Sequence, residues 1–230
     1  MAWKILEEQA PFEAALKAYR RRVPMTDEDF QELLDQNHEV AFKIADINSL
    51  ELVFDVWQAL DRSLENGTDF RTFKKEFGAR LKEQWSGTSK QKATRLATVF
   101  RNQTQQSYNH GRYLQMEEPE LKRLRPYRLF DAVRDKRTSK ICKDCNGTLL
   151  PADDPWWDSH VPPLHHACRS TVRSLRARDA ARRGVTQSPT ETASAEGFGS
   201  KPQRQVTPIE VDLSKYPPEL RAAFERKQAA

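Results

Sequence analysis

The sequence predicts a mainly α-helical protein that carries a small zinc-stabilised α+β module and an extended C-terminal tail. Three observations lead to this fold class. Apolar residues recur at helical spacing through the first 118 residues, and this pattern ends near Pro126, where turn-forming residues and a Cys/His cluster follow. Residues 185–208 contain few large apolar side chains, so they cannot offset their ordering entropy alone. We therefore expect a helical domain over 1–120, a metal-containing module over 121–184 and a tail over 185–230.

The helices of the first domain are predicted from their apolar faces and end signals. Three stretches have apolar residues at the i, i+3, i+4 and i+7 spacing of a buried helix face. They are Leu50, Val53, Phe54, Trp57 and Leu60, then Phe70, Phe73, Phe77 and Leu81, then Leu96, Val99, Phe100, Tyr108 and Leu114. The breaks between helices fall at Pro24, Asn66-Gly67, Gly87-Thr88-Ser89 and Pro119. Thr26, with Asp29 three positions later, is typical of a helix start.

The rest of the chain has weaker signals. Tyr127–Val133 is expected to form a short strand, and 146–163 a loop, because Gly, Pro, Asp and Trp dominate it. Cys168–Arg183 is expected to form a basic helix ended by Gly184. Tyr216–Lys227 is expected to form a short terminal helix that begins at two prolines.

Composition excludes several classes of protein. No run of about 18 apolar residues is present, and the first residues lack an apolar stretch and a cleavage site, so we expect neither a membrane span nor a secretory signal. Three cysteines, an odd number in 230 residues, do not make a disulfide scaffold, and reduced thiols in a cytosol are expected. The sequence contains no Gly-rich phosphate loop and no Gly-x-Ser-x-Gly turn.

Charge is segregated along the sequence. The formal net charge is only +5, but residues 1–60 carry 12 acids against 6 bases. Residues 121–143 carry 9 bases against 2 acids, and residues 169–183 carry 6 arginines against 1 acid. The cationic residues taken as candidates for DNA contact are Arg134, Lys136, Arg137, Arg169, Arg173 and Arg176. Such clusters contact phosphates without reading bases, although a solvated helix face with local acid partners gives the same pattern.

The strongest candidates for a functional site are the motifs Cys142-x-x-Cys145 and His165-x-x-Cys168, which together contain every cysteine of the sequence. A CxxC turn places two sulfurs on one side of a loop, and HxxC adds an imidazole and a third thiolate. Four such ligands complete a tetrahedral zinc shell, which leaves no open position for catalysis. We therefore predict a structural zinc site. His166 is a competing fourth ligand, since only the spacing favours its neighbour.

Other interpretations of this stretch stay open. His160 is a weaker candidate ligand, and the cysteines are also compatible with small buried core residues. A redox CxxC is disfavoured because no βαβ context surrounds it. Nearby acids suggest a two-metal or acid/base site, but they lie among bases or in turns. They are Asp131, Asp135, Asp153, Asp154 and Asp158. Trp156 and Trp157 either cap the metal site or contact a partner.

Several ordered blocks of the sequence resemble one family. They are Val133-Arg134-Asp135-Lys136-Arg137-Thr138, Asn146-Gly147, Leu150-Pro151-Ala152-Asp153-Asp154-Pro155-Trp156-Trp157, Val161-Pro162-Pro163 and Cys168-Arg169-Ser170-Thr171-Val172. Upstream blocks at Ala41–Ala45 and Phe100–Arg112 match as well. Over about residues 10–180 the chain is therefore similar to the Mu F-like minor head proteins of tailed bacteriophages.

The chain also departs from the pattern of that family. Many members have His at the position of Cys142, a non-ligand at that of Cys145, and Cys-Arg-Cys where this chain has Cys168-Arg169-Ser170. The prediction of metal therefore rests on the spacing in this sequence.

The resemblance implies a non-enzymatic virion component, present in few copies, that is needed for head assembly. It is expected on the inner face of the capsid near the portal vertex, after assembly in the host cytoplasm. The implied partners are the portal protein, the major capsid protein and packaged double-stranded DNA, bound without sequence preference. Two alternatives are a metal-dependent nuclease, suggested by His165-His166 and the nearby acids, and a free DNA-binding protein with a zinc module.

Overall fold

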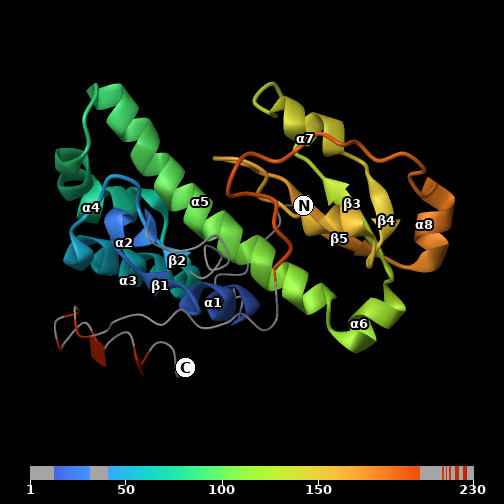
Figure 1. Ribbon diagram of the computed structural model, residues 1–230, viewed down its shortest axis with the longest axis horizontal. Helices are drawn as coiled ribbons and strands as arrows, with labels where there is room; N and C mark the ends of the chain where they lie inside the picture. The colour runs from blue at the N-terminus through green and yellow to red at the C-terminus, as the bar shows by residue number, and fades with distance from the viewer. Residues whose placement is uncertain are drawn as a thin grey trace, which may run out of the picture.

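The structure is a computed structural model that describes residues 13–31, 41–202 and a few positions between 214 and 226 (Figure 1). Its helices are α1 (Glu13–Arg20), α2 (Asp27–Gln31), α3 (Leu50–Asn66), α4 (Phe70–Gln84), α5 (Ser89–Met116), α6 (Pro119–Leu124), α7 (Lys140–Cys145), the 3-10 turn η2 (Pro155–Asp158) and α8 (Ala177–Arg183). Its strands are β1 (Val23–Pro24), β2 (Ala41–Phe42), β3 (Tyr127–Asp131), β4 (Leu149–Pro151) and β5 (Thr171–Leu175). The mainly helical part of the prediction is confirmed. In the described part of the chain, no helix is both long and apolar enough to cross a bilayer.

Side-chain caps set the helix boundaries that the sequence predicts. The Thr26 hydroxyl accepts the Asp29 amide N–H at 3.0 Å before α2. Ser49 caps α3, which ends at Gly67 in the left-handed conformation, with φ 68°. Thr88 and Gln91 form a reciprocal capping box at the start of α5. These caps satisfy amide groups that a helix terminus leaves without partners.

Two apolar cores lie along α5. The first is built by α1, α3, α4 and the β1–β2 pair and contains the predicted aromatic faces, with Leu96 from α5 fully buried in it. The second core contains Tyr113 and Met116 from the other end of α5, together with Phe130 and Trp157. Figure 1 shows α5 running between the two groups of elements. The long helix therefore positions the C-terminal module.

Helix α1 packs directly on α5. Gly111 of α5 makes this approach possible, because a Cβ there would lie 2.5 Å from the backbone nitrogen of Ala15 and closer to the carbonyl of Ala14. An ion pair also links α1 to α3, since Arg20 Nε donates to the fully buried carboxylate of Asp61 at 2.7 Å. A buried carboxylate needs such a partner to offset its lost hydration.

The module is a three-stranded antiparallel sheet in the order β4-β3-β5. Side chains alternate along β3, so that Leu129 packs with Ala180 of α8 while Phe130 enters the second core. Arg128 is fully buried, and its guanidinium donates to the Met116 carbonyl at the end of α5 and to Glu117 Oε1 at 3.0 Å. The sheet is thereby joined to the end of the long helix.

The structure corrects the expected helix over Cys168–Arg183. Residues Thr171–Leu175 form strand β5, paired with β3, and only Ala177–Arg183 is helical. The expected loop over 146–163 also contains β4 and the turn η2. Half of the expected terminal helix, Tyr216–Lys227, lies outside the described residues, and five of the six described positions are helical: Pro218, Arg221, Ala222, Glu225 and Arg226.

Residues 185–202 form no helix or strand and run along the module as an extended segment (Figure 1). Their backbone hydrogen bonds go to the module: the Ala195 N–H donates to Leu164 O at 2.8 Å, and the Gly199 N–H donates to Pro163 O at 3.0 Å. The segment therefore supplies partners for backbone groups that would otherwise be unpaired. The division of the chain into domains at 120 and 184 stays a prediction.

Candidate metal centre

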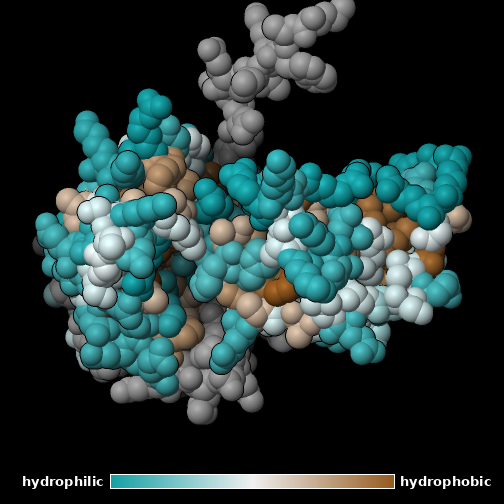
Figure 2. Space-filling view, turned by 90° about the horizontal axis from the view of Figure 1, so that it is seen from above, coloured by the Kyte–Doolittle hydropathy of each residue, from teal (hydrophilic) through white to brown (hydrophobic). Residues whose placement is uncertain are grey.

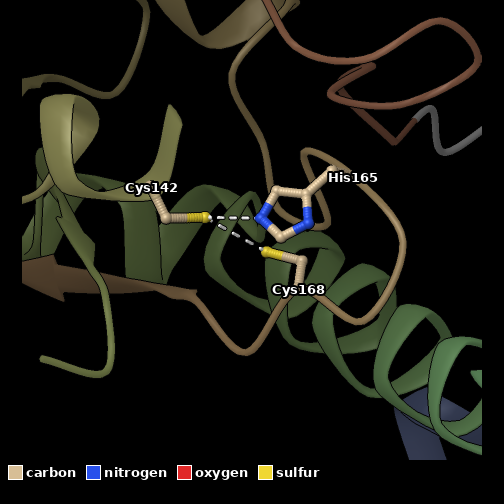
Figure 3. A group of neighbouring side chains, drawn as sticks. All are labelled: Cys142, His165 and Cys168. Carbon is tan, nitrogen blue, oxygen red and sulfur yellow. Dashed lines mark hydrogen bonds between the residues drawn. The ribbon is translucent and has the colours of Figure 1, made fainter. Parts of the chain in front are cut away.

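Three of the predicted ligands converge on one point. Cys142 Sγ lies 3.1 Å from His165 Nε2 and 3.6 Å from Cys168 Sγ, and the three ligand atoms lie within 4.8 Å of one another (Figure 3). Cys142 is on α7, and the other two side chains come from the loop that precedes β5. Both cysteines are buried, each with 2% of its surface exposed. The group could hold a metal ion.

Ser139 positions the first ligand. Its hydroxyl caps α7 by accepting the Cys142 amide N–H at 3.2 Å, and the same oxygen lies 2.7 Å from His165 Nε2. The cap fixes the start of a six-residue helix that is too short to be stable by itself. The local sequence therefore folds so that Cys142 faces the histidine.

The His165 ring is oriented by its own loop. Its Nδ1 lies 2.7 Å from the backbone oxygen of His166. A carbonyl oxygen only accepts, so this contact places the proton on Nδ1 and leaves Nε2 as an acceptor that faces the Ser139 hydroxyl and Cys142 Sγ. Histidines that bind metals in proteins are commonly oriented by such a hydrogen bond to a carbonyl.

The two neighbouring thiols titrate unequally. A hydrogen bond from Cys142 lowers the pKa of Cys168, and the same bond, together with burial, raises the pKa of Cys142. Metal binding would displace any proton that the two thiols still carry.

Cys145 does not join this group. It is fully buried in the second core, and burial raises the pKa of its thiol to about 11. Both cysteines of the motif lie on helix α7, where residues three apart are displaced by about 4.5 Å along the axis. The spacing alone suggested a turn that directs both sulfurs to one side. Among the described residues, the site therefore has three protein ligands.

The two other candidate histidines have different contacts. The Nδ1 atom of His166 lies 2.8 Å from the Asn102 amide nitrogen on α5, and the ring meets Phe198 edge to face. His160 stacks on Trp156 with ring centroids 4.1 Å apart, and its Nε2 lies 3.1 Å from Thr192 O. The structure thus selects His165 from the two adjacent histidines.

The tryptophans are packing residues. Trp157 is fully buried, and its indole N–H donates to Pro151 O at 3.0 Å. The Trp156 indole N–H donates to Thr190 O at 2.8 Å and so holds the C-terminal segment. Both tryptophans pack in the second core, which also contains Cys142 and Cys168.

Five of the six candidate DNA-contact residues lie near the end of β3 or pair with acids there, and Arg176 lies apart from them. Arg134, Lys136 and Arg137 lie in the exposed loop after β3, whereas Arg176 follows β5, at the opposite end of the sheet. Several candidates have acid partners: Arg169 forms a bidentate pair with Asp135 at 2.6 and 2.7 Å, Arg173 lies 3.4 Å from Asp131, and Arg137 lies 3.8 Å from Asp135. In the described structure, Arg134, Lys136 and Arg176 have no carboxylate within 4.0 Å.

Asn102 and Asn109 of α5 also contribute to this region, although nothing in the sequence around them indicates a role at the metal site. Asn102 Oδ1 accepts the Ala167 amide N–H at 2.7 Å, and the buried Asn109 donates to Ser170 O at 3.0 Å. They lie seven residues apart, two helical turns, on one face of α5. The two asparagines hold the loop of the metal site on the long helix.

The fold and this site define a helical protein in which one long helix carries a small module built around a Cys/His group. A family model described as Phage Mu protein F like protein matches residues 55–173, a span that includes α5 and all three ligands. The chain belongs to this family.

Two relatives give the extent of the similarity. The chain is 30% identical over 157 residues to the Mu-like prophage FluMu F protein of Haemophilus influenzae, which covers 64% of this chain and 37% of that protein. It is 28% identical over 163 residues to the putative capsid assembly protein F of Escherichia phage Mu, which covers 65% of this chain and 37% of that protein. The matches thus span well under half of the length of each relative. No solved structure matches the chain.

Proposed function

We propose that this chain is a structural protein of phage head assembly, that it has no enzymatic activity, and that a zinc ion holds its module in shape. The proposal rests on the family match over 55–173. This span includes α7, which carries Cys142, and the loop that carries the other two ligands. The relative from phage Mu is named a putative capsid assembly protein. The expected place of the chain is the inner face of the capsid near the portal vertex.

The three ligands fit zinc. In a tetrahedral site, Zn–S and Zn–N bonds of about 2.3 and 2.0 Å place two sulfurs about 3.8 Å apart and a sulfur and a nitrogen about 3.5 Å apart. Two of the corresponding separations in the structure are 3.6 and 3.1 Å, and the third pair, Cys168 Sγ and His165 Nε2, lies within 4.8 Å, so side-chain shifts without a change of fold suffice. Thiolate and imidazole ligands are those that zinc prefers. Zinc would stabilise a loop-rich segment directly by joining α7 to the loop before β5.

The acids that suggested a nuclease have structural contacts. Asp135 pairs with Arg169, Asp131 with Arg173, and Asp153 with Lys122. Asp154 caps η2 by accepting the Trp156 N–H, and Asp158 lies 3.8 Å from Lys201. His166 is held by Asn102 and Phe198. These contacts support a structural role.

The proposed partners are the portal protein, the major capsid protein and packaged DNA. The acidic residues of 1–60 favour contact with protein, whereas the exposed loop with Arg134 and Lys136 favours phosphates. Figure 2 shows a largely hydrophilic face with only small apolar areas. Phosphate contacts of this kind give weak, salt-sensitive binding that does not depend on sequence.

The assembly role is tested in the phage that encodes the chain. Deleting the gene is expected to reduce the number of DNA-filled heads, and mass spectrometry of purified heads is expected to detect the chain cross-linked to the portal protein. Normal yields of infectious particles without the gene would refute the proposed role. So would absence of the chain from purified heads.

Zinc and DNA are tested on the purified protein. Elemental analysis of reductively purified material is expected to give one zinc per chain, and a value near zero would exclude the ion. The protein is expected to bind two unrelated duplexes equally, with an affinity that falls as salt rises. Arg134→Ala is expected to weaken this binding more than Arg169→Ala, because Asp135 already pairs with Arg169. A strong preference for one duplex would favour a free regulator, and cleavage of the DNA would favour a nuclease.

A further inference from the structure

One peptide group lies between the metal-ligand group and helix α5. It joins His166 to Ala167, within the two-residue link that separates the ligands His165 and Cys168. Its carbonyl oxygen lies 2.7 Å from Nδ1 of His165, and its N–H donates to Asn102 Oδ1 at 2.7 Å. Because a peptide group is planar, rotating it would break both contacts together. The orientation of the ligand ring and the contact with α5 are therefore set by one group.

The link is held in a conformation that its sequence disfavours. Ala167 has φ 57°, in the left-handed region that a residue with a Cβ rarely adopts. Such a conformation persists only where surrounding contacts determine it. Asn102 supplies two of these contacts, since its amide nitrogen also lies 2.8 Å from Nδ1 of His166. Figure 3 shows the loop that carries His165 and Cys168 beside the long helix.

The C-terminal segment contacts the same loop. Phe198 meets the His166 ring with centroids 4.8 Å apart. The Gly199 N–H bonds to Pro163 O, and a side chain at Gly199 would collide with the Ser159 carbonyl. The loop is therefore supported both by α5 and by a segment beyond the sheet.

We propose that Asn102 is a positioning residue of the metal site, through which metal occupancy is coupled to the seating of the module on α5. The inference rests on the metal centre of the proposed function and adds a residue 63 positions before the first loop ligand. Asn102 does not bind the ion. It fixes the peptide that orients His165, so the loop loses less conformational entropy when the ion binds. By linkage, the ion in turn stabilises the contact between the loop and α5.

The test uses the full chain, purified in reductant, and measures zinc affinity by competition with a chromophoric chelator. Asn102→Ala is expected to weaken zinc binding about 10- to 100-fold, the usual effect of removing a group that orients a metal ligand. With Co²⁺ as the probe, the sulfur-to-metal absorption bands are expected to keep their wavelengths, because the ligands are unchanged. The matched control is Thr104→Ala. The Thr104 hydroxyl donates to Phe100 O at 2.9 Å, so its contact stays within α5. This control is expected to bind zinc as the unmodified chain does.

A second variant separates positioning from folding. Asn102→Asp keeps an acceptor for the Ala167 N–H and is expected to retain most of the zinc affinity. An equal loss in Asn102→Asp and Asn102→Ala would overturn the proposal, as would unchanged affinity in a folded Asn102→Ala protein. If the unmodified chain binds no zinc, the metal centre itself fails and this inference fails with it. That outcome differs from one in which the unmodified chain and both variants bind equally well.

Discussion

The close backbone contact between α1 and α5 gives a prediction about stability. Gly111 of α5 lies against the backbone of α1, and a Cβ added there would lie 2.5 Å from Ala15 N, whereas ordinary contacts begin at 3.4 Å. Gly111→Ala would thus require α1 to move by about 1 Å, because backbone atoms cannot rotate away as a side chain can. The movement would disturb Tyr19, whose hydroxyl donates to Trp57 O at 2.8 Å.

The magnitude follows from two opposing effects. Replacing a helix-interior glycine with alanine stabilises a helix by about 1 kcal/mol. Overpacking a well-packed contact costs about 1–3 kcal/mol, and a backbone collision belongs at the upper end of that range. We expect a net loss of about 2 kcal/mol in the free energy of unfolding. For a chain of this length, that loss lowers the melting temperature by about 4–8 °C.

Thermal and urea unfolding, followed by circular dichroism, measure this change. Gly78→Ala on α4 is the control, because a Cβ there would lie 3.3 Å from the end of the flexible Leu96 side chain. The control is expected to leave the melting temperature unchanged or to raise it by up to about 4 °C, because alanine stabilises a helix interior by about 1 kcal/mol relative to glycine. A Gly111→Ala protein as stable as the unmodified chain, or more stable, would refute the close backbone contact between α1 and α5.

Three further predictions concern the module, protonation and the C-terminal segment. Cys168→Ser is expected to abolish stoichiometric zinc binding, whereas Cys145→Ser leaves the affinity in chelator competition within about threefold, because Cys145 lies outside the ligand group. Burial and two neighbouring arginines lower the pKa of His110 from 6.5 to about 3. The unfolded chain therefore binds more protons, and unfolding free energies measured over this range should fall as pH drops from 6.5 towards 3, with a smaller slope in His110→Gln. A chain that ends at Gly184 loses the hydrogen bonds that Thr186, Ala195 and Gly199 donate to carbonyls of the module, each with a net contribution of about 1 kcal/mol. Differential scanning fluorimetry should therefore show a lower melting temperature, and an unchanged melting curve would contradict the packing of the segment.

The helical half was predictable because its signals are local. The cap at Ser49, the left-handed Gly67 and the capping box at Thr88 each depend on residues a few positions apart. Strand β5 was not predictable in this way. Its arginines suggested a helix, but pairing with β3 places Val172 in the second core and Arg173 outside, so tertiary contacts decide the conformation.

The metal centre was predictable in type and only partly in detail. Spacing alone selects Cys142, Cys145, Cys168 and one of two histidines, because ligands in short motifs are close in sequence. It cannot show that Cys142 and Cys145 lie on a helix, α7, from which only the Cys142 sulfur joins the ligand group. Nor can it show that Asn102, 65 residues before Ala167, accepts its N–H. Contacts between distant segments are not encoded in the spacing of either one.

The 28-residue helix α5, about 42 Å long, contributes side chains to both apolar cores. Unfolding the half of α5 that carries Tyr113 would expose the second core to solvent. Unfolding the half that carries Leu96 would expose the first core. Neither half of the protein can lose this helix and keep its own interior. Amide protons beside Leu96 and beside Tyr113 should therefore exchange with solvent slowly, each at the rate at which its own core opens.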